Sequence, residues 1–297
     1  MTNGQQDVLL DLLGAMGGHV GPTDFQKLLF LYTKECEQSA SYDFIPYRFG
    51  CFSFTATADR RRLVDRGMLS DDEDGWVLTD TGRAYTAMRR QTGVMAGFVR
   101  RYGRLRGYPL VAEVYRRYPY YATRSTILDK VLTIAAERDA VARACPPKRG
   151  AGMLTIGYEG RSLEGYLNAI LLAGVTLLCD VRANPLSRKY GFSKKTLSHA
   201  CEGVGIRYEH VPELGIPSAD RQELNVQADY DRLFAKYQRD ILPRQTAAVQ
   251  RIGRWVVDDG QRVALTCYER LPEQCHRRCV AIAVERQFGP LLASSHL

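Results

Sequence analysis

The first half of the chain carries apolar residues at helical spacing. Leucine and valine recur between residues 7 and 16 and stop at Gly17-Gly18, which predicts a first helix with a glycine terminus. Further helices are predicted over residues 23–32, 56–66 and 127–144. An aromatic segment over residues 42–54, interrupted by Pro46 and Gly50, is predicted to be an ordered loop, and residues 76–79 a short strand. The pattern indicates a mainly helical domain over residues 1–144.

Buried strands alternate with amphipathic helices in the second half. Strands are predicted over residues 153–158, 174–182, 207–211 and 263–266. Helices are predicted over residues 163–173, with Ser162 as N-cap, and over 193–201, 230–242, 245–258 and 272–287. Strand, helix and strand of these lengths form a βαβ unit with parallel strands and a right-handed connection. We therefore expect a Rossmann-like, mostly parallel α/β sheet with flanking helices over residues 153–297, after a linker over residues 145–152.

Residues 56–82 add a pattern of their own. A helix ends at Gly67-Met68-Leu69, an acidic turn spans residues 71–75, and a strand ends in Leu78-Thr79. With the two helices before it, this order resembles a winged-helix module, and residues 24–32 also resemble the start of certain antitoxin-associated helical domains. The winged-helix resemblance implies that the third helix enters the major groove of DNA, with basic side chains on its polar face: Arg60, Arg61 and Arg62. The alternatives are a solvated helix face and a winged helix used for protein contacts.

Composition narrows the class of protein. At 297 residues, with 45% hydrophobic and 25% charged residues, the chain suits two soluble globular domains. It has no apolar segment long enough to span a bilayer and no basic, apolar leader, so we expect a cytoplasmic protein without a membrane partner. Its eight cysteines should then be reduced thiols. The net charge of +8 favours polyanionic partners.

Arginine and tyrosine are concentrated between residues 98 and 124. Arginine neutralises phosphate and tyrosine stacks on bases, as a single-stranded or distorted nucleic acid requires. The candidate nucleic-acid contacts in this segment are Arg100, Arg101, Arg104, Arg116 and Arg117. The same composition also suits a domain interface. We expect nucleic acid as the partner, DNA before RNA, and leave a homodimer open.

The densest group of reactive side chains follows the strand at residues 263–266. Cys267 and Glu269 are predicted at its C-terminal end, where ligands bind in open α/β sheets. Cys275, His276 and Arg277 are predicted near the start of the next helix, where free N–H groups favour an anion and lower the pKa of a thiol.

Two alternatives apply to this group. The cysteines can be small core residues. The other alternative is a zinc site made by Cys267, Cys275 and His276, but the spacing Cys-x7-Cys-His matches no strong metal pattern. The prediction is therefore a site without a metal or cofactor.

Several motifs follow one another between residues 155 and 277. They are Thr155-Ile156-Gly157-Tyr158, Asp180-Val181-Arg182 with Pro185 and Ser187-Arg188, Phe192-x-Lys194, Gly205-Ile206 with Tyr208, His210 and Pro212, and Cys267-x-Glu269 with Pro272 and Cys275-His276-Arg277. In this order they resemble the bacterial domain-of-unknown-function family 488, over about residues 153–288. Tyr158 departs from the family, many members of which carry histidine there. The resemblance implies a Rossmann-like sheet with these motifs on one rim, and it implies no activity.

Polar residues at the C-terminal ends of parallel strands should meet at one edge of the sheet. The candidate catalytic residues there are Asp180, Glu269, His210, Cys267 and Tyr158, with Asp180 or Glu269 as acid or base. The candidate substrate-binding residues are Arg182, Asn184, Ser187, Arg188, Lys194, Cys275, His276 and Arg277. Joined to a DNA-binding domain, this edge predicts a nucleic-acid-directed hydrolase that removes a base or cuts the backbone.

Two other functions fit the same residues. In the first, the protein is a DNA-binding regulator whose second domain senses a nucleotide-like ligand. In the second, Cys267 at the end of a strand resembles the nucleophile of rhodanese and cysteine-phosphatase domains, although the loop after it has no glycine to form a tight anion cradle. The hydrolase hypothesis requires Asp180, His210 and Glu269 to face one pocket.

Overall fold

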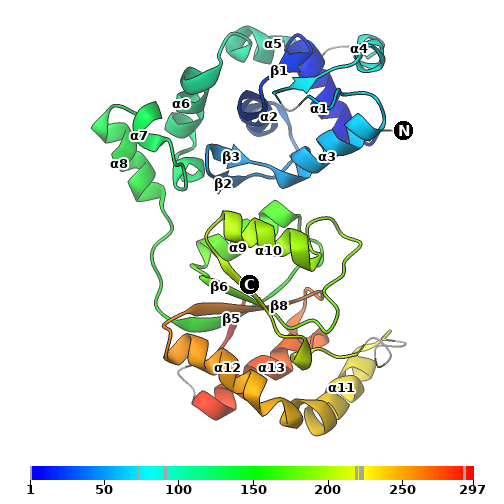
Figure 1. Ribbon diagram of the computed structural model, residues 1–297, viewed down its shortest axis with the longest axis vertical. Helices are drawn as coiled ribbons and strands as arrows, with labels where there is room; N and C mark the ends of the chain where they lie inside the picture. The colour runs from blue at the N-terminus through cyan, green and yellow to red at the C-terminus, as the bar shows by residue number, and fades with distance from the viewer. Residues whose placement is uncertain (1, 73, 90–91, 218–219, 221–223, 290–291) are drawn as a thin grey trace. The chain divides into compact units, whose positions relative to one another are not determined.

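The chain divides into two compact units, Met1–Cys145 and Pro146–Leu297, and the division falls within the predicted linker (Figure 1). The computed structural model describes residues 2–72, 74–89, 92–217, 220, 224–289 and 292–297. Among the helices it describes, none is long and apolar enough to cross a membrane.

The first unit is mainly helical. Its α-helices are α1 (Gly4–Ala15), α2 (Pro22–Cys36), α3 (Phe54–Asp65), α4 (Asp80–Ala87), α5 (Gly93–Tyr102), α6 (Gly107–Arg117), α7 (Leu128–Val131) and α8 (Ala135–Ala144). Two antiparallel pairs of short strands join them, β1 (His19–Val20) with β4 (Trp76–Val77) and β2 (Ile45–Tyr47) with β3 (Gly50–Phe52). The predicted end of the first helix is confirmed: Gly17 and Gly18 adopt positive φ angles of 94° and 77°, which glycine alone adopts freely.

Two secondary-structure predictions for this unit are wrong. Residues 42–54 contain the β2–β3 hairpin rather than only a loop. The single helix predicted over residues 127–144 is broken into α7 and α8, because Leu132 takes an extended backbone and buries its side chain completely. Arg138 Nη1 donates to the carbonyl of Leu132 at 2.8 Å, so this carbonyl keeps a partner across the break. Packing against the core overrides the helical pattern here.

The tyrosines of residues 98–124 contribute to the core of the first unit. Tyr102 and Tyr115 are 1% and 0% exposed. The rings of Tyr118 and Tyr121 pack edge-on against Phe30, with ring centroids 5.0 and 4.6 Å apart. The expectation of a stacking surface for bases is therefore wrong for Tyr102 and Tyr115, because the core already covers both rings.

The second unit is a mixed α/β structure with a five-stranded parallel sheet, which confirms the predicted class at this level. The strand order is β7-β6-β8-β5-β9. The strands are β5 (Gly152–Gly157), β6 (Leu177–Asp180), β7 (Arg207–His210), β8 (Arg262–Cys267) and β9 (Ser295–His296).

Helices cover both faces of this sheet. Helices α9 (Leu163–Leu172) and α10 (Lys194–Gly203) lie on one face, and α11 (Gln227–Lys236), α12 (Thr246–Val257) and α13 (Arg277–Phe288) on the other (Figure 1). Ser162 caps α9 as predicted, since its hydroxyl accepts a hydrogen bond from the N–H of Gly165 at 2.9 Å. The apolar strands β5, β6 and β8 lie at the centre of this unit, with Leu177, Val263 and Leu265 fully buried.

The strand register brings distant residues to one edge. Gly157 at the end of β5 pairs with Cys267 at the end of β8, and Asp180 at the end of β6 pairs with both Thr266 and His210. The segments that follow these strands therefore leave the sheet together.

Candidate functional site

A pocket of about 490 Å³ opens where β5 and β6 end. Its lining is rich in cationic and hydrogen-bonding side chains: Tyr158, Arg182, Ala183, Asn184, Leu186, Ser187, Arg188, Lys189, Ile216 and Tyr268. None of these lining residues carries a carboxylate. Arg188 and Asn184 are exposed, and Ser187 and Lys189 are half-buried. The pocket therefore offers positive charge and donors to an anion.

A buried ion pair between Arg182 and Asp180 fixes the position of the lining residue Arg182. Arg182 donates from Nε to Asp180 Oδ1 at 2.8 Å and from Nη2 to Oδ2 at 2.5 Å, which is a bidentate pair. The Tyr208 hydroxyl donates to Asp180 Oδ2 at 2.6 Å. Arg182 Nη1 also donates to the Tyr158 hydroxyl and to the carbonyl of Phe192, each at 2.9 Å.

This arrangement leaves Asp180 without access to a ligand. Asp180 is 0% exposed and Arg182 is 4% exposed. Burial alone would lower the pKa of Arg182, but its hydrogen bonds to Asp180 and the charge of that carboxylate raise it instead. The predicted role of Asp180 as acid or base is therefore corrected: its carboxylate positions Arg182, and it does not line the pocket.

Tyr158 lines the pocket at the end of β5. Its ring stacks on that of Phe192, with centroids 4.3 Å apart. Burial raises the pKa of Tyr158 above its usual value, so its hydroxyl stays protonated at neutral pH. A protonated phenol donates a hydrogen bond to a ligand and does not act as a base.

His210 and Lys194 are not among the residues that line the pocket, and His210 lies beside the backbone of Arg182. His210 Nε2 lies 2.8 Å from the carbonyl oxygen of Arg182, and Nδ1 lies 3.3 Å from Lys194 Nζ. The imidazole thus contacts the backbone that carries Arg182. The structure brings Asp180 and His210 together, as predicted from parallel strands, but in contact with Arg182 and not with the pocket.

A Tyr208→Phe variant tests the buried pair through pH. Burial and the charge of Asp180 raise the pKa of Tyr208 above 10.0. The phenol of Tyr208 loses its proton at a lower pH in the unfolded chain than in the folded protein. The stability that this proton contributes is therefore fully present below pH 10 and is lost as the pH rises above it. With rising pH, the free energy of unfolding should fall more steeply in the wild type than in Tyr208→Phe. The two slopes should differ by at most about 1.4 kcal/mol per pH unit. Urea unfolding at about pH 9 and about pH 11 measures both slopes, and equal slopes would contradict the expectation.

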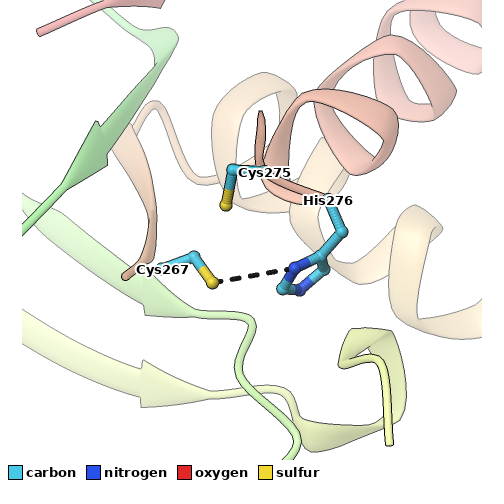
Figure 2. Close-up of side chains that lie close together, drawn as sticks. All are labelled: Cys267, Cys275 and His276. Atoms are coloured by element: carbon cyan, nitrogen blue, oxygen red, sulfur yellow. Dashed lines mark hydrogen bonds between the residues drawn. The ribbon is translucent and has the colours of Figure 1, made fainter. Parts of the chain in front are cut away.

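Two cysteines and a histidine form a second group of side chains. Cys267 is the last residue of β8, whereas Cys275 and His276 immediately precede α13, and the three side chains point toward one another (Figure 2). Their ligand atoms lie within 4.8 Å of one another. Cys267 Sγ lies 3.6 Å from His276 Nδ1 and 3.4 Å from Glu269 Oε2. All three residues are at most 1% exposed, whereas Glu269 is half-buried.

The backbone before α13 differs from the prediction. A short 3-10 helix covers Pro272–Gln274, Cys275 is extended, and α13 begins at Arg277 with His276 as its N-cap. The thiol of Cys275 is buried, and this burial, together with Cys267 beside it, raises its pKa well above the usual value. The expectation of a lowered thiol pKa at this helix start is therefore wrong, because desolvation opposes the thiolate. Cys267, also fully buried, does not present an accessible nucleophile.

Arg277 is a structural residue in this arrangement. It is 0% exposed, and its guanidinium donates to Thr155 Oγ1 at 3.2 Å and to the carbonyls of Glu269 and Arg270 at 2.5 and 2.9 Å. The prediction that it holds a substrate anion is corrected, because its donors are directed at the chain itself. Arg277 instead fixes the backbone that carries Glu269.

The arginines predicted to contact nucleic acid differ in their surroundings. Arg60 donates to backbone carbonyls of Asp72 and Gly75. Ion pairs engage Arg62 with Asp59, Arg116 with Glu137, and both Arg101 and Arg117 with Glu35. Within the part of the chain that the structure describes, the exposed members without an ion pair are Arg61, Arg100 and Arg104. Among the predicted arginines, these three side chains are therefore the most accessible to phosphate groups.

Two residues that contribute to the site are absent from the sequence-based set. Lys189 lines the pocket, and its Nζ donates to the carbonyl of Tyr158 at 3.2 Å. Tyr208 donates to Asp180 from the neighbouring strand. Lys189 follows Ser187 and Arg188 directly, so its place in the same loop was a usable signal. The role of Tyr208 depends on β6 and β7 being neighbours, which no local pattern shows.

One comparison with known proteins gives a match. Residues 162–284 match the family model described as domain of unknown function DUF488. No curated protein and no solved structure matches the chain. The matched segment contains Asp180, Arg182, Glu269 and the Cys267, Cys275 and His276 group, whereas Tyr158 precedes it.

Proposed function

We propose that this protein acts on nucleic acid and that the pocket at the sheet edge holds one of its phosphate groups. The lining of the pocket carries this proposal. It presents Arg188, Lys189, Asn184 and Ser187, and none of the lining residues that the structure describes carries a carboxylate. The charge of Arg182 is balanced by Asp180, so Arg188 and Lys189 supply the positive charge that remains in the lining. Cations and amide donors are the groups that bind phosphate oxygens.

Asp180, His210 and Glu269 are not among the residues that line the pocket, so the shared pocket that the hydrolase hypothesis requires is not formed by these three. The hydrolysis that we propose therefore keeps Glu269 alone as the acid or base. Asp180 is fully buried behind Arg182, whereas Glu159 and Glu269 are half-buried carboxylates next to the lining residues Tyr158 and Tyr268. We choose Glu269 because it belongs to the Cys267-x-Glu269 motif. Carboxylates in this setting take or give the proton of an attacking water or a leaving group. The target within the nucleic acid is a glycosidic or a phosphodiester bond.

The first unit would supply contacts to DNA in a winged-helix-like manner. Arg61 on α3 and the exposed Arg100 and Arg104 support this part of the proposal. Contacts to phosphate by such side chains give affinity that falls as salt concentration rises.

A DNA-binding regulator that senses a nucleotide is the second candidate. The described lining residues favour it, because they offer donors to an anion and include no carboxylate to serve as acid or base. Both candidates place a phosphate in the pocket.

The test is oligonucleotide binding by an Arg188→Ala variant. Removing a charged donor to phosphate is expected to weaken binding by about tenfold or more. Fluorescence anisotropy with labelled single- and double-stranded oligonucleotides at fixed salt measures the affinity. Arg254→Ala is the matched control, since it removes the same charge from an exposed site on α12 that does not line the pocket. Equal affinities in the two variants would refute the pocket as the phosphate site.

The same oligonucleotides distinguish the two candidates. After incubation with the wild type, a shortened or base-free product on a denaturing gel supports the hydrolase. A bound oligonucleotide or nucleotide recovered intact supports the regulator.

A further inference from the structure

We propose that Cys267, Cys275 and His276 bind a Zn²⁺ ion. The two sulfurs and one ring nitrogen belong to segments that the fold brings together, one at the end of β8 and one before α13 (Figure 2). Two thiolates and an imidazole are the ligands that zinc prefers, and three protein ligands with a fourth position left for water are found at catalytic zinc sites.

The distances fit a tetrahedral ion. With bonds of about 2.3 Å from zinc to sulfur and about 2.0–2.1 Å to nitrogen, tetrahedral geometry separates the two ligand atoms by about 3.5 Å. Cys267 Sγ and His276 Nδ1 lie 3.6 Å apart. All three ligand atoms lie within 4.8 Å of one another, so only small side-chain movements are needed to close the site.

The second ring nitrogen of His276 provides an independent observation. Nε2 lies 2.9 Å from the carbonyl oxygen of Val181, which is an acceptor only, so Nε2 carries the proton. Nδ1 is then the unprotonated nitrogen, and it faces Cys267 Sγ. Metal-binding histidines are held in this way, by donation of the other N–H to a backbone carbonyl or carboxylate.

The surrounding backbone is held firmly on both sides of the group. Arg277 fixes the carbonyls of Glu269 and Arg270, and Cys275 donates its N–H to the carbonyl of Pro272 at 3.1 Å. Such outer contacts set the ligand directions before the ion binds. The cysteines thus occupy positions determined by the fold rather than by a flexible loop.

Glu269 lies beside this group, and the group itself is at most 1% exposed, so the ion would position the segment that carries Glu269 rather than contact the substrate; this part of the inference rests on the proposed function. Glu269 Oε2 lies 3.4 Å from Cys267 Sγ. Bound by Cys267, Cys275 and His276, zinc would fix the backbone that carries Glu269, the proposed acid or base.

Metal content of the full chain tests the site without any substrate. Purified without chelators and dialysed after addition of zinc, the wild type should retain about one zinc ion per chain, measured by inductively coupled plasma mass spectrometry. Cys267→Ser and Cys275→Ser should lower the content by about tenfold or more. Cys279→Ser is the matched control, a buried cysteine on α13 outside the group, and should retain zinc like the wild type. Glu269→Gln should also retain it, whether or not the protein acts on nucleic acid.

A cobalt experiment on the wild type covers the case in which the cysteine variants fail to fold. Co²⁺ bound by two thiolates gives intense thiolate-to-cobalt absorption, which zinc then displaces. Absence of these bands would overturn the proposal, as would a wild type without zinc or a Cys267–Cys275 disulfide in the native protein. Undiminished zinc in both cysteine variants would overturn it equally.

Discussion

Arg182→Ala is expected to destabilise the second unit by about 3–5 kcal/mol. The carboxylate of Asp180, which is 0% exposed in the wild type, keeps only the Tyr208 hydroxyl and the backbone N–H of residue 182 as donors after the substitution. An uncompensated buried charge is among the most costly defects a folded protein can carry. The same change removes the bonds to Tyr158 and Phe192, so oligonucleotide binding in the pocket should be lost with the stability.

Tryptophan fluorescence reports this unit separately. The chain has two tryptophans, Trp76 in the first unit and Trp255 on α12 in the second. Urea unfolding in a Trp76→Phe background therefore follows the second unit through Trp255 and gives its free energy of unfolding.

Two variants separate charge from shape at this position. Arg188→Ala, in the same pocket but exposed, should change stability by less than about 0.5 kcal/mol. Asp180→Leu combined with Arg182→Met removes both charges while keeping apolar volume, and should regain most of the lost stability. A double variant as unstable as Arg182→Ala would show that packing, and not the unpaired charge, causes the loss.

Gly157→Ala is expected to cost about 3 kcal/mol, at the upper end of the usual range for overpacking, or to prevent folding of the second unit. A Cβ at Gly157 would lie 1.9 Å from the carbonyl oxygen of Glu269 and 2.7 Å from its carbonyl carbon. These are backbone atoms held by Arg277, so no side-chain rotation relieves the clash. The segment that follows Cys267 must move, and the zinc content expected for the wild type should fall in any folded Gly157→Ala protein.

Gly152→Ala is the matched control on the same strand. A Cβ there would approach Arg262 Nη1 at 3.1 Å, which is the far end of a flexible side chain. Its free energy of unfolding and zinc content should stay close to those of the wild type. A Gly157→Ala protein as stable as Gly152→Ala would contradict the close approach of β5 to the segment after β8.

Local sequence pattern was sufficient for much of the architecture. The alternation of apolar strands with amphipathic helices predicted the parallel sheet, because a βαβ connection leaves few topologies. The Ser162 cap and the Gly17-Gly18 terminus were predicted because their causes lie within a few residues of each other. The pattern failed at α7 and α8, where burial of Leu132 outweighed helical periodicity.

The site shows the same division between local and distant causes. Parallel strands were enough to predict that Asp180, His210 and Cys267 end at one edge. They did not show that Asp180 would be sealed by Arg182, since that depends on Tyr208 from the adjacent strand and on the carbonyl of Phe192. Arg277 likewise carries a guanidinium suited to binding a substrate anion, but this group donates to Thr155 and to the backbone after Cys267.

The sequence by itself determined which side chains reach the C-terminal edge of the sheet, because strand direction and the residues at strand ends follow from short-range patterns. Only the tertiary structure decided which of them face the pocket and which are buried in pairs. Burial and hydrogen-bond partners come from segments that are distant along the chain, and these surroundings determine whether a carboxylate, guanidinium or thiol is available for chemistry.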